Sequence, residues 1–253
     1  MIISHTHRFV FVHCRKTAGS SVKAALAPYL GPDDLVVGGL NEVLRARGRL
    51  NRRMRRDLLH PLAWYGFGRG LAASGRLSEA INRGIKMRYV QALGLNPPHP
   101  PAERVAAAFP RAWNEYFKFC FIRNPFSQVV SDYWWRRRMS GADLNFDDFL
   151  EYLEKEKTGN DNGTLEPGTV PNWRMYTIDD RIAVDFVGDY DNLTEDFKHV
   201  LTQIGIDTEP PIPHEKVGLK TDTLGSAAQL TKRQTERIRR IFDKEIDAFN
   251  FKP

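Results

Sequence analysis

Short runs of apolar residues alternate with amphipathic stretches along the 253 residues of this chain. Runs rich in β-branched and aromatic residues at 9–12, 116–122 and 183–187 predict buried strands. Helical patterns follow the first two runs, at 22–26 and 126–138. Strands that alternate with helices in this way predict a three-layer α/β fold, in which helices flank a central, mainly parallel sheet.

Two pairs of residues have the spacing of a capping box and mark the starts of two further helices. Asn192 with Glu195 is the first pair, and Thr231 with Gln234 is the second. The other predicted elements are a short strand at 34–37 and helices at 102–109 and 145–155.

No internal repeat or domain boundary stands out, so the sequence predicts a single domain over residues 1–253. The segment at about 38–94 combines helical fragments, arginines and scattered glycines. It predicts an irregular helical insertion that covers the functional site or contacts a substrate. Residues 158–171, rich in Gly, Asn and Thr, predict a surface loop.

The composition is that of a soluble globular protein, with 42% hydrophobic and 27% charged residues. No apolar run approaches the ~20 residues that span a bilayer, and the first residues lack the pattern of a signal peptide. We therefore expect a cytoplasmic protein without a transmembrane segment. Cys14 and Cys120 predict buried free thiols, and they provide neither a disulfide framework nor metal-ligand spacing.

The net charge of +6 favours anionic partners, and the positive charge is concentrated in an arginine-rich stretch at 45–56. A nucleic-acid-binding protein can use such a run. However, no nucleic-acid motif surrounds it, and aromatic residues are absent until Trp64. The stretch is therefore interpreted as a solvated helix face or as a patch that attracts an anionic substrate.

The segment 8–26, RFVFVHCRKTAGSSVKAAL, contains the clearest functional pattern. A strand, a small polar turn and a helix start place several backbone N–H groups around one point, where the helix dipole adds positive charge. Lys16 contributes a full charge, and hydroxyl groups stand beside it. The segment predicts a site for phosphate or sulfate formed by Arg15, Lys16, Thr17, Ala18, Gly19, Ser20 and Ser21.

The order of residues in this turn differs from the usual triphosphate-binding pattern G-x-x-x-x-G-K-[ST], in which lysine follows the second glycine. Here Lys16 precedes Gly19, and no glycine lies five residues before Gly19. The order K-T-A-G-S-S instead resembles the 5′-phosphosulfate loop of sulfotransferases that use 3′-phosphoadenosine 5′-phosphosulfate (PAPS).

A second segment, FCFIRNPFSQVVSDYWW, resembles the 3′-phosphate-binding segment of the same family. In that family an arginine at a strand end and a serine eight residues later hold the 3′-phosphate, and Arg123 and Ser131 have this spacing. Arginine offers phosphate a bidentate fork. Asn124 is suited to cap the following helix and Pro125 to occupy its first turn. Lys16 and Arg123 both follow strands, so one ligand can contact both.

The resemblance extends to residues 185–197 and 244–251, and thus covers most of the chain apart from about 38–94. The subgroup that it most resembles sulfates carbohydrates, as heparan and chondroitin sulfotransferases do. Arg15 stands where the subgroup's loop usually has proline, and Gln128 where its helix usually has arginine. These departures concern the fine contacts with the cofactor.

The resemblance implies a P-loop-like fold, transfer from PAPS to a hydroxyl acceptor such as a glycan, and 3′-phosphoadenosine 5′-phosphate as the product. Lys16 is predicted to stabilise the leaving oxygen. The resemblance places the catalytic base at His99, and Glu103 is the next candidate. The alternative interpretation of His99 is an exposed loop histidine. The scheme requires no metal and no nucleic-acid partner.

Two other functions compete with this one. A phosphate-loop kinase or nucleotidase would need Mg²⁺, for which Asp189 or Asp191 could supply the acid. A non-enzymatic protein could bind an anionic polymer through the arginine-rich stretch. For the adenine, Trp134, Trp173 and Tyr176 are all possible contacts, and the sequence does not choose among them.

Overall fold

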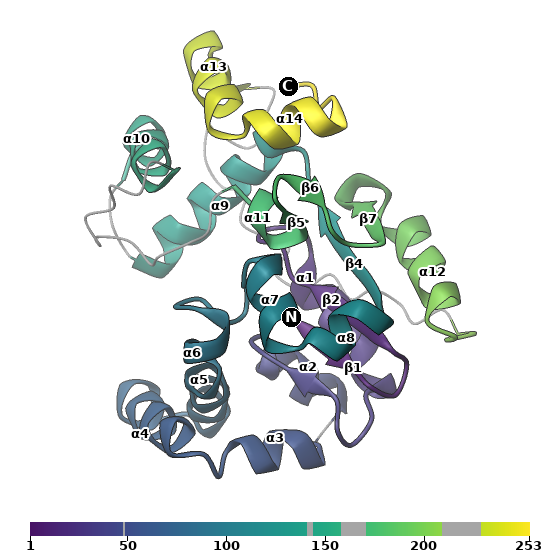
Figure 1. Ribbon diagram of the computed structural model, residues 1–253. Helices are drawn as coiled ribbons and strands as arrows, with labels where there is room; N and C mark the ends of the chain where they lie inside the picture. The colour runs from purple at the N-terminus through teal and green to yellow at the C-terminus, as the bar shows by residue number, and fades with distance from the viewer. Residues whose placement is uncertain (48, 141–143, 158–170, 209–228) are drawn as a thin grey trace. The chain divides into compact units, whose positions relative to one another are not determined.

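The computed structural model describes residues 1–47, 49–140, 144–157, 171–208 and 229–253 (Figure 1). The chain divides into two compact units. The first unit comprises residues 1–121 and 174–215, and the second comprises 122–173 and 216–253. Most of the predicted loop at 158–171 lies outside the described residues.

The first unit is built on a five-stranded sheet in the order β3-β1-β2-β4-β7. Its strands are β1 (Ile2–Ser4), β2 (Phe9–Val12), β3 (Leu35–Val36), β4 (Phe117–Ile122) and β7 (Phe186–Asp189). β2 and β4 are parallel, with Phe9 opposite Phe117, whereas β1 is antiparallel to both β2 and β3. Hence β2, β3 and β4 share one direction, and the predicted α/β fold with a mainly parallel sheet is confirmed.

Aromatic side chains fill the sheet's core. Phe9, Phe11, Phe119 and Phe121 are all buried, and the rings of Phe11 and Phe119 stack with centroids 5.1 Å apart. Burying side chains of this size contributes about 1.5–3 kcal/mol each. The flanking elements are α1 (Gly19–Leu26), η1 (Ala27–Tyr29), α7 (Ala102–Ala108), α8 (Pro110–Glu115), η2 (Tyr190–Asn192) and α12 (Leu193–Gln203).

The strand predicted at 183–187 lies slightly later, at β7. Asp185 explains the shift, because its backbone N–H donates to the Lys118 carbonyl while its carboxylate accepts from the Lys118 N–H, at 2.8 and 2.7 Å. A small hairpin of β5 (Thr177–Ile178) and β6 (Arg181–Ile182) precedes it.

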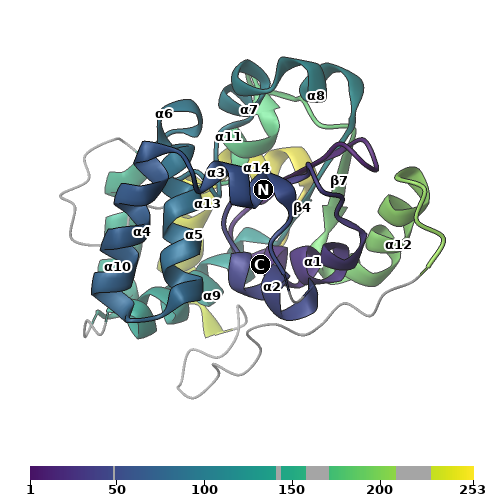
Figure 2. The ribbon, with the colours of Figure 1, turned by 90° about the horizontal axis from the view of Figure 1, so that it is seen from below.

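Residues 38–94 are largely helical where they are described. They form α2 (Leu40–Arg47), α3 (Arg52–Asp57), α4 (Pro61–Ser74), α5 (Leu77–Arg88) and α6 (Val90–Leu93). Figure 2 shows α4 and α5 side by side. Glycines permit this close packing: a Cβ atom on Gly70 would lie 2.8 Å from the Ala80 Cα, and one on Gly84 would lie 2.9 Å from the Ala63 carbonyl oxygen.

The second unit is helical, with α9 (Pro125–Ser140), α10 (Phe146–Lys157), α13 (Lys232–Ile241) and α14 (Asp243–Phe249); α11 (Trp173–Tyr176) leads back to the first unit along the chain. Its core joins side chains from all four, including Val129, Phe149, Ile238 and Ile246. Arg237 on α13 also donates to both carboxylate oxygens of Glu154 on α10, at 3.0 and 2.8 Å.

The capping predictions had different outcomes. Thr231 and Gln234 form a complete capping box, as predicted. Helix α12 begins directly after Asn192, as predicted, but the Asn192 side chain makes no capping hydrogen bond, so the predicted capping box is wrong. The Asn192 side chain instead donates to Asp196 Oδ1 at 2.8 Å. Both cysteines are buried free thiols, as predicted. Within the described ranges, no helix has the length and apolar character required to cross a bilayer.

Candidate functional site

The predicted anion site is a tight loop between β2 and α1. Lys16 and Ala18 adopt left-handed backbone conformations, with φ of 61° and 59°. Such conformations cost a non-glycine residue roughly 1 kcal/mol and are held only where the surrounding structure enforces them. The Thr17 hydroxyl helps to do so by donating to the Cys14 carbonyl at 3.0 Å. The loop thus reverses the chain and leads directly into α1.

Helix α1 begins at Gly19, with Ala18 in the N-cap position. Alanine has no side-chain acceptor for the N–H groups of the first helical turn, whereas Ser, Thr, Asp or Asn in this position would supply one. Gly19, Ser20 and Ser21 form that first turn. The positive end of the α1 dipole lies at this turn and favours a bound anion.

Gly19 is packed against the ring of His13. A Cβ atom on Gly19 would lie 1.8 Å from His13 Cδ2, which is far inside any real contact. The His13 ring also stacks on Phe11 of β2, with centroids 5.9 Å apart. His13 therefore supports the loop from the core side.

His99 reaches the same loop although it lies 86 residues away from His13 in sequence. Its Nδ1 lies 2.6 Å from the His13 carbonyl oxygen, and the two rings are 4.4 Å apart between centroids. A carbonyl oxygen only accepts, so Nδ1 carries the proton and Nε2 carries the lone pair. His99 belongs to the proline-rich segment 96–101. This segment is held in place as well, because Pro98 packs closely against Gly38.

Burial lowers the pKa of His99 well below its usual range, and the nearby positive charge of Arg15 lowers it further. The hydrogen bond with the His13 backbone acts in the opposite direction but does not outweigh these effects. The side chain is nevertheless only half-buried by surface area. His99 is therefore neutral at pH 7 and can accept a proton. Glu103 is exposed in the first turn of α7.

Lys23 is a site residue that the sequence analysis did not find. Its side chain is completely buried on α1, and Nζ donates to the carbonyl oxygens of Val37 and Gly38 at 3.1 and 2.8 Å. These bonds tie α1 to the segment that follows β3. A lysine pattern alone cannot reveal this role, because both acceptors are backbone groups more than ten residues away.

The predicted 3′-phosphate segment belongs largely to the second unit, whereas the loop belongs to the first. Arg123 follows β4, and its Nε donates to Ser127 Oγ at 3.0 Å. The Ser127 hydroxyl in turn donates to the Asn124 carbonyl at 3.0 Å. Ser131 lies one turn further along α9, on the same face as Ser127. Ser127 is thus an additional orienting residue beside Arg123.

Asn124 fixes the start of α9, as predicted. Its Oδ1 accepts from the Phe126 backbone N–H at 3.1 Å, and Pro125 occupies the first helical position. Its amide nitrogen donates to the Lys252 carbonyl at 2.6 Å. Gln128, which departs from the family pattern, is buried on α9. The described residues contain no group of His, Cys, Asp and Glu that could hold a metal ion.

The comparisons with known proteins agree with the sequence motifs. An uncharacterized protein of Archaeoglobus fulgidus is 33% identical over 99 residues, which is 39% of this chain and 76% of that protein. No solved structure matches the chain. The model of the family described as "Sulfotransferase family" matches residues 1–252, and the chain therefore belongs to the sulfotransferase family, which transfers sulfuryl groups.

Proposed function

We propose that this protein transfers a sulfuryl group from PAPS to a hydroxyl group of a carbohydrate. The observation that carries the proposal is the loop at residues 13–21, with His99 beside it. This loop brings a helix start, a lysine and a histidine together within one unit. Family membership supports sulfuryl transfer in general, and the donor, acceptor and residue roles are our proposals.

The loop fits a phosphosulfate group. The first-turn N–H groups of α1 and the positive end of its dipole favour an anion, and the absence of a side chain on Gly19 lets the His13 ring pack against the start of this helix. Residues 15–21 would hold the 5′ end of the donor. When bound there, PAPS would supply the sulfuryl group and a nucleotide leaving group.

Lys16 is assigned to the leaving oxygen. Negative charge grows on that oxygen as its bond to sulfur breaks, and a cation held nearby stabilises the transition state more than the ground state. The left-handed backbone of Lys16 is part of the turn, so the geometry of the loop sets the point from which the lysine side chain extends.

His99 is assigned as the base. Its protonated Nδ1 donates to the His13 carbonyl, and this leaves the lone pair of Nε2 to accept the proton of the acceptor hydroxyl. The lowered pKa keeps the imidazole neutral below pH 7. Glu103 remains the alternative base, and its exposure in the first turn of α7 is compatible with contact to a substrate.

Arg123 and Ser131 are assigned to the donor's 3′-phosphate. The bond from Arg123 Nε to Ser127 fixes the plane of the guanidinium group, and a fixed plane is what bidentate contact with phosphate oxygens requires. The carbohydrate acceptor rests on the resemblance of the motifs to carbohydrate sulfotransferases.

Lys16→Ala tests the proposal most directly, with the exposed Lys198→Ala on α12 as the matched control. Transfer of labelled sulfate from PAPS to cell-derived glycans should fall by at least about a hundredfold in Lys16→Ala and remain unchanged in Lys198→Ala. Binding of 3′-phosphoadenosine 5′-phosphate and of ATP with Mg²⁺ should be measured in parallel. Binding of ATP alone would favour the kinase or nucleotidase instead.

A further inference from the structure

The hairpin of α4 and α5 has an unusual distribution of side-chain sizes. The buried residues of α4 are Ala63, Gly66 and Gly70. A surface helix normally buries its large apolar side chains and exposes polar ones. In α4 the buried residues are among the smallest, so close packing of the two backbones contributes to joining α4 and α5.

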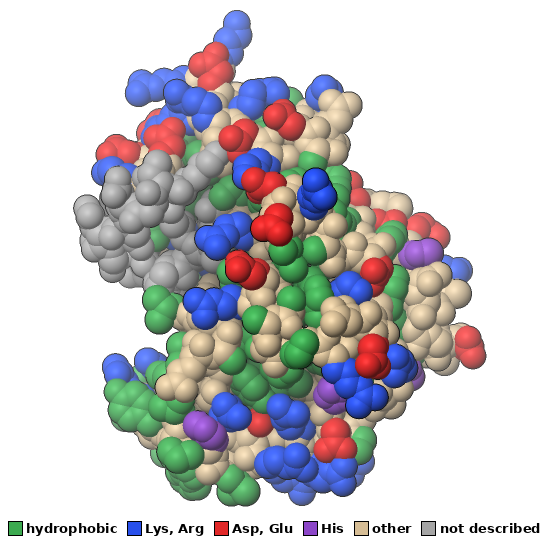
Figure 3. Space-filling model, viewed as in Figure 1, with side chains coloured by type: hydrophobic (Ala, Val, Ile, Leu, Met, Phe, Trp, Pro, Cys, Tyr) green, Lys and Arg blue, Asp and Glu red, His purple; other side chains and the backbone are tan. Residues whose placement is uncertain are grey.

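The large apolar side chains of this hairpin face solvent instead. Trp64 is 61% exposed, Tyr65 56% and Leu71 43%, all on α4. Leu59 just before α4 is 73% exposed, and Leu77 at the start of α5 is 62% exposed. Figure 3 shows hydrophobic side chains gathered where α4 lies in Figure 1. These five residues form what we call the hairpin patch. Such a grouping of exposed apolar residues marks an interaction surface.

The charges around the hairpin patch are mostly positive, although Glu79 lies in the first turn of α5 and accepts from Asn41. Residues 43–78 contain nine arginines and a single acidic residue, Asp57. Asp57 is buried, where it pairs with Arg53 and accepts a hydrogen bond from the Tyr89 hydroxyl. The exposed surface of this segment is therefore cationic. Its exposed arginines are Arg45, Arg49, Arg52, Arg55, Arg56, Arg69 and Arg76.

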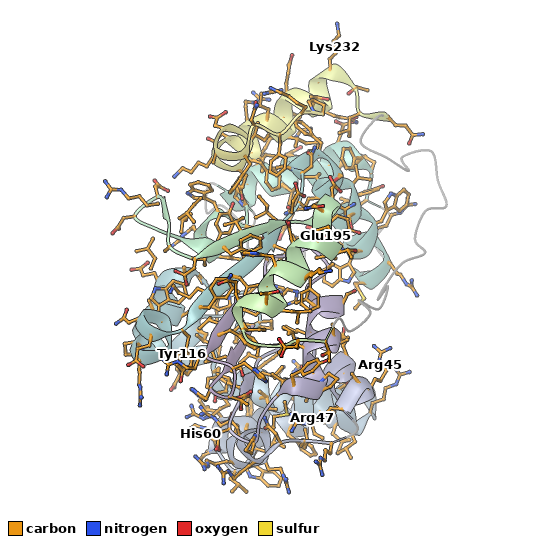
Figure 4. All side chains as sticks on the ribbon, turned by 90° about the vertical axis from the view of Figure 1, so that its right-hand side faces the viewer. Arg45, Arg47, His60, Tyr116, Glu195 and Lys232 are labelled. Atoms are coloured by element: carbon orange, nitrogen blue, oxygen red, sulfur yellow. The ribbon has the colours of Figure 1, made fainter. Side chains whose placement is uncertain are left out.

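Cationic and apolar groups also meet directly. Arg69 donates to the Tyr65 hydroxyl at 2.9 Å, and its guanidinium carbon lies 5.6 Å from the centre of the Tyr65 ring. In Figure 4, Arg45 and Arg47 on α2 lie toward the same end of the first unit as His60, the N-cap of α4. Arg69 therefore lies within the hairpin patch, and Arg45 lines one pocket together with Ser78, the neighbour of the patch residue Leu77.

We propose that the hairpin patch docks onto the surface of a membrane that contains anionic lipids. Trp and Tyr favour the interface between lipid and water, leucine side chains enter the acyl boundary, and arginines attract anionic headgroups. A protein partner for this surface would need an apolar centre surrounded by negatively charged residues. Helix α4 has 14 residues, fewer than the ~20 that span a bilayer, so it lies along the interface. The proposal is independent of the donor and acceptor assigned above.

The test is co-sedimentation of the full chain with phospholipid vesicles. One set contains phosphatidylcholine alone, and the other contains phosphatidylcholine with one third phosphatidylglycerol. We expect binding to the anionic vesicles to be at least about tenfold stronger. The variant Trp64→Ser/Leu77→Ser should lose at least about tenfold in this binding, and Arg69→Gln/Arg76→Gln about tenfold. The control variant Ile182→Ser loses an exposed apolar residue on β6, outside the hairpin of α4 and α5. It should bind the vesicles as the parent chain does.

Circular dichroism and thermal unfolding would show that each variant is folded, as the exposure of these side chains predicts. Equal binding to both kinds of vesicle, no binding to either, or undiminished binding by the folded Trp64→Ser/Leu77→Ser variant would each overturn the proposal. Light scattering distinguishes a further case. A dimer that this double variant abolishes would show that a second copy of the chain covers the patch, and would also overturn it.

Discussion

At the scale of single residues, Gly19 is a loop position that has no room for a side chain. A Cβ atom there would enter the His13 ring, so Gly19→Ala must displace either the ring or the start of α1. We expect Gly19→Ala to lower the free energy of unfolding by about 1–3 kcal/mol and to reduce sulfuryl transfer more strongly still. Urea unfolding and transfer assays on the same preparations would measure both.

Gly68 provides the matched control for this change. It lies within α4, and a Cβ atom there would have no neighbour within 4 Å. Gly68→Ala should therefore stabilise the protein by roughly 0.5–1 kcal/mol, because alanine favours the helix. Similar stability changes in the two variants would contradict the close packing of His13 on Gly19.

His99 makes stability depend on pH. In the unfolded chain a histidine takes up a proton near pH 6.5, whereas in the folded chain His99 has a much lower pKa. The unfolded state then binds more protons, so the free energy of unfolding falls as the pH decreases below about 6.5. We expect His99→Asn, which keeps a donor for the His13 carbonyl, to weaken this pH dependence between about pH 7 and 5.

Chemical unfolding at several pH values would measure the effect. The exposed His199→Asn on α12 serves as the control and should keep the parent's pH dependence. A parent chain whose stability does not decline more steeply than that of His99→Asn would show that folding does not lower the pKa of His99. In that case burial would not be what keeps the imidazole neutral in the proposed mechanism.

At the scale of elements, the position of α1 depends on Lys23. Lys23→Met keeps an apolar stem of similar length but removes the donor to the Val37 and Gly38 carbonyls. The Val37 carbonyl still accepts from the Met1 amine at 2.9 Å, whereas the Gly38 carbonyl loses this donor, and a buried acceptor that loses its partner costs about 1–3 kcal/mol. We expect a destabilisation within this range or above it, together with weaker binding of 3′-phosphoadenosine 5′-phosphate because the helix start shifts. Calorimetric titration and thermal unfolding would check both.

Lys198→Met, a change of the same chemistry on the exposed face of α12, should leave stability within about 0.5 kcal/mol. If Lys23→Met unfolded like Lys198→Met, the two backbone acceptors would not need the ammonium group. Weakened nucleotide binding with unchanged stability would instead point to a direct contact between Lys23 and the ligand.

Elements that depend on local chemistry could be predicted from the sequence. The start of α9 follows from the cap at Asn124 and from Pro125, which act within one helical turn. Strand β1 was not predicted, because three residues form a strand only through pairing with β2 and β3. The side-chain cap predicted at Asn192 does not form, because the Asn192 side chain donates to Asp196 instead. Competition between nearby polar groups is not visible in a spacing pattern.

In the candidate site, too, features set by local sequence could be predicted, whereas features set by tertiary contacts could not. The order of residues 15–21 indicated an anion loop, and the family match agrees with that motif. The support from His13 and the anchor at Lys23 depend on tertiary contacts, and even the short-range contact of Arg123 with Ser127 depends on side-chain conformation. The spacing of residues in the sequence predicts none of these three contacts. The catalytic and binding roles stay predictions, because packing shows position and not turnover.

At the scale of the whole molecule, the net charge of +6 should speed the approach of an anionic nucleotide. Much of that charge lies on exposed arginines such as Arg45 and Arg49. Raising the salt concentration from about 0.01 M to about 0.15 M shortens the screening length from about 30 Å to about 8 Å. We expect the association rate constant of 3′-phosphoadenosine 5′-phosphate to fall several-fold over this range, while the dissociation rate constant changes less. Stopped-flow measurements would give both constants.

Arg45→Gln/Arg49→Gln should reduce this salt dependence, because two positive charges are removed from the first unit, to which the loop belongs. Lys232→Gln/Arg233→Gln on α13 removes the same charge from the second unit and is the matched control. Equal effects would mean that the net charge alone steers the nucleotide, whereas a larger effect of the first pair would mean that the uneven distribution matters. An association rate constant independent of salt in the parent chain would contradict steering altogether, and the arginine-rich stretch would then act on some partner other than the nucleotide.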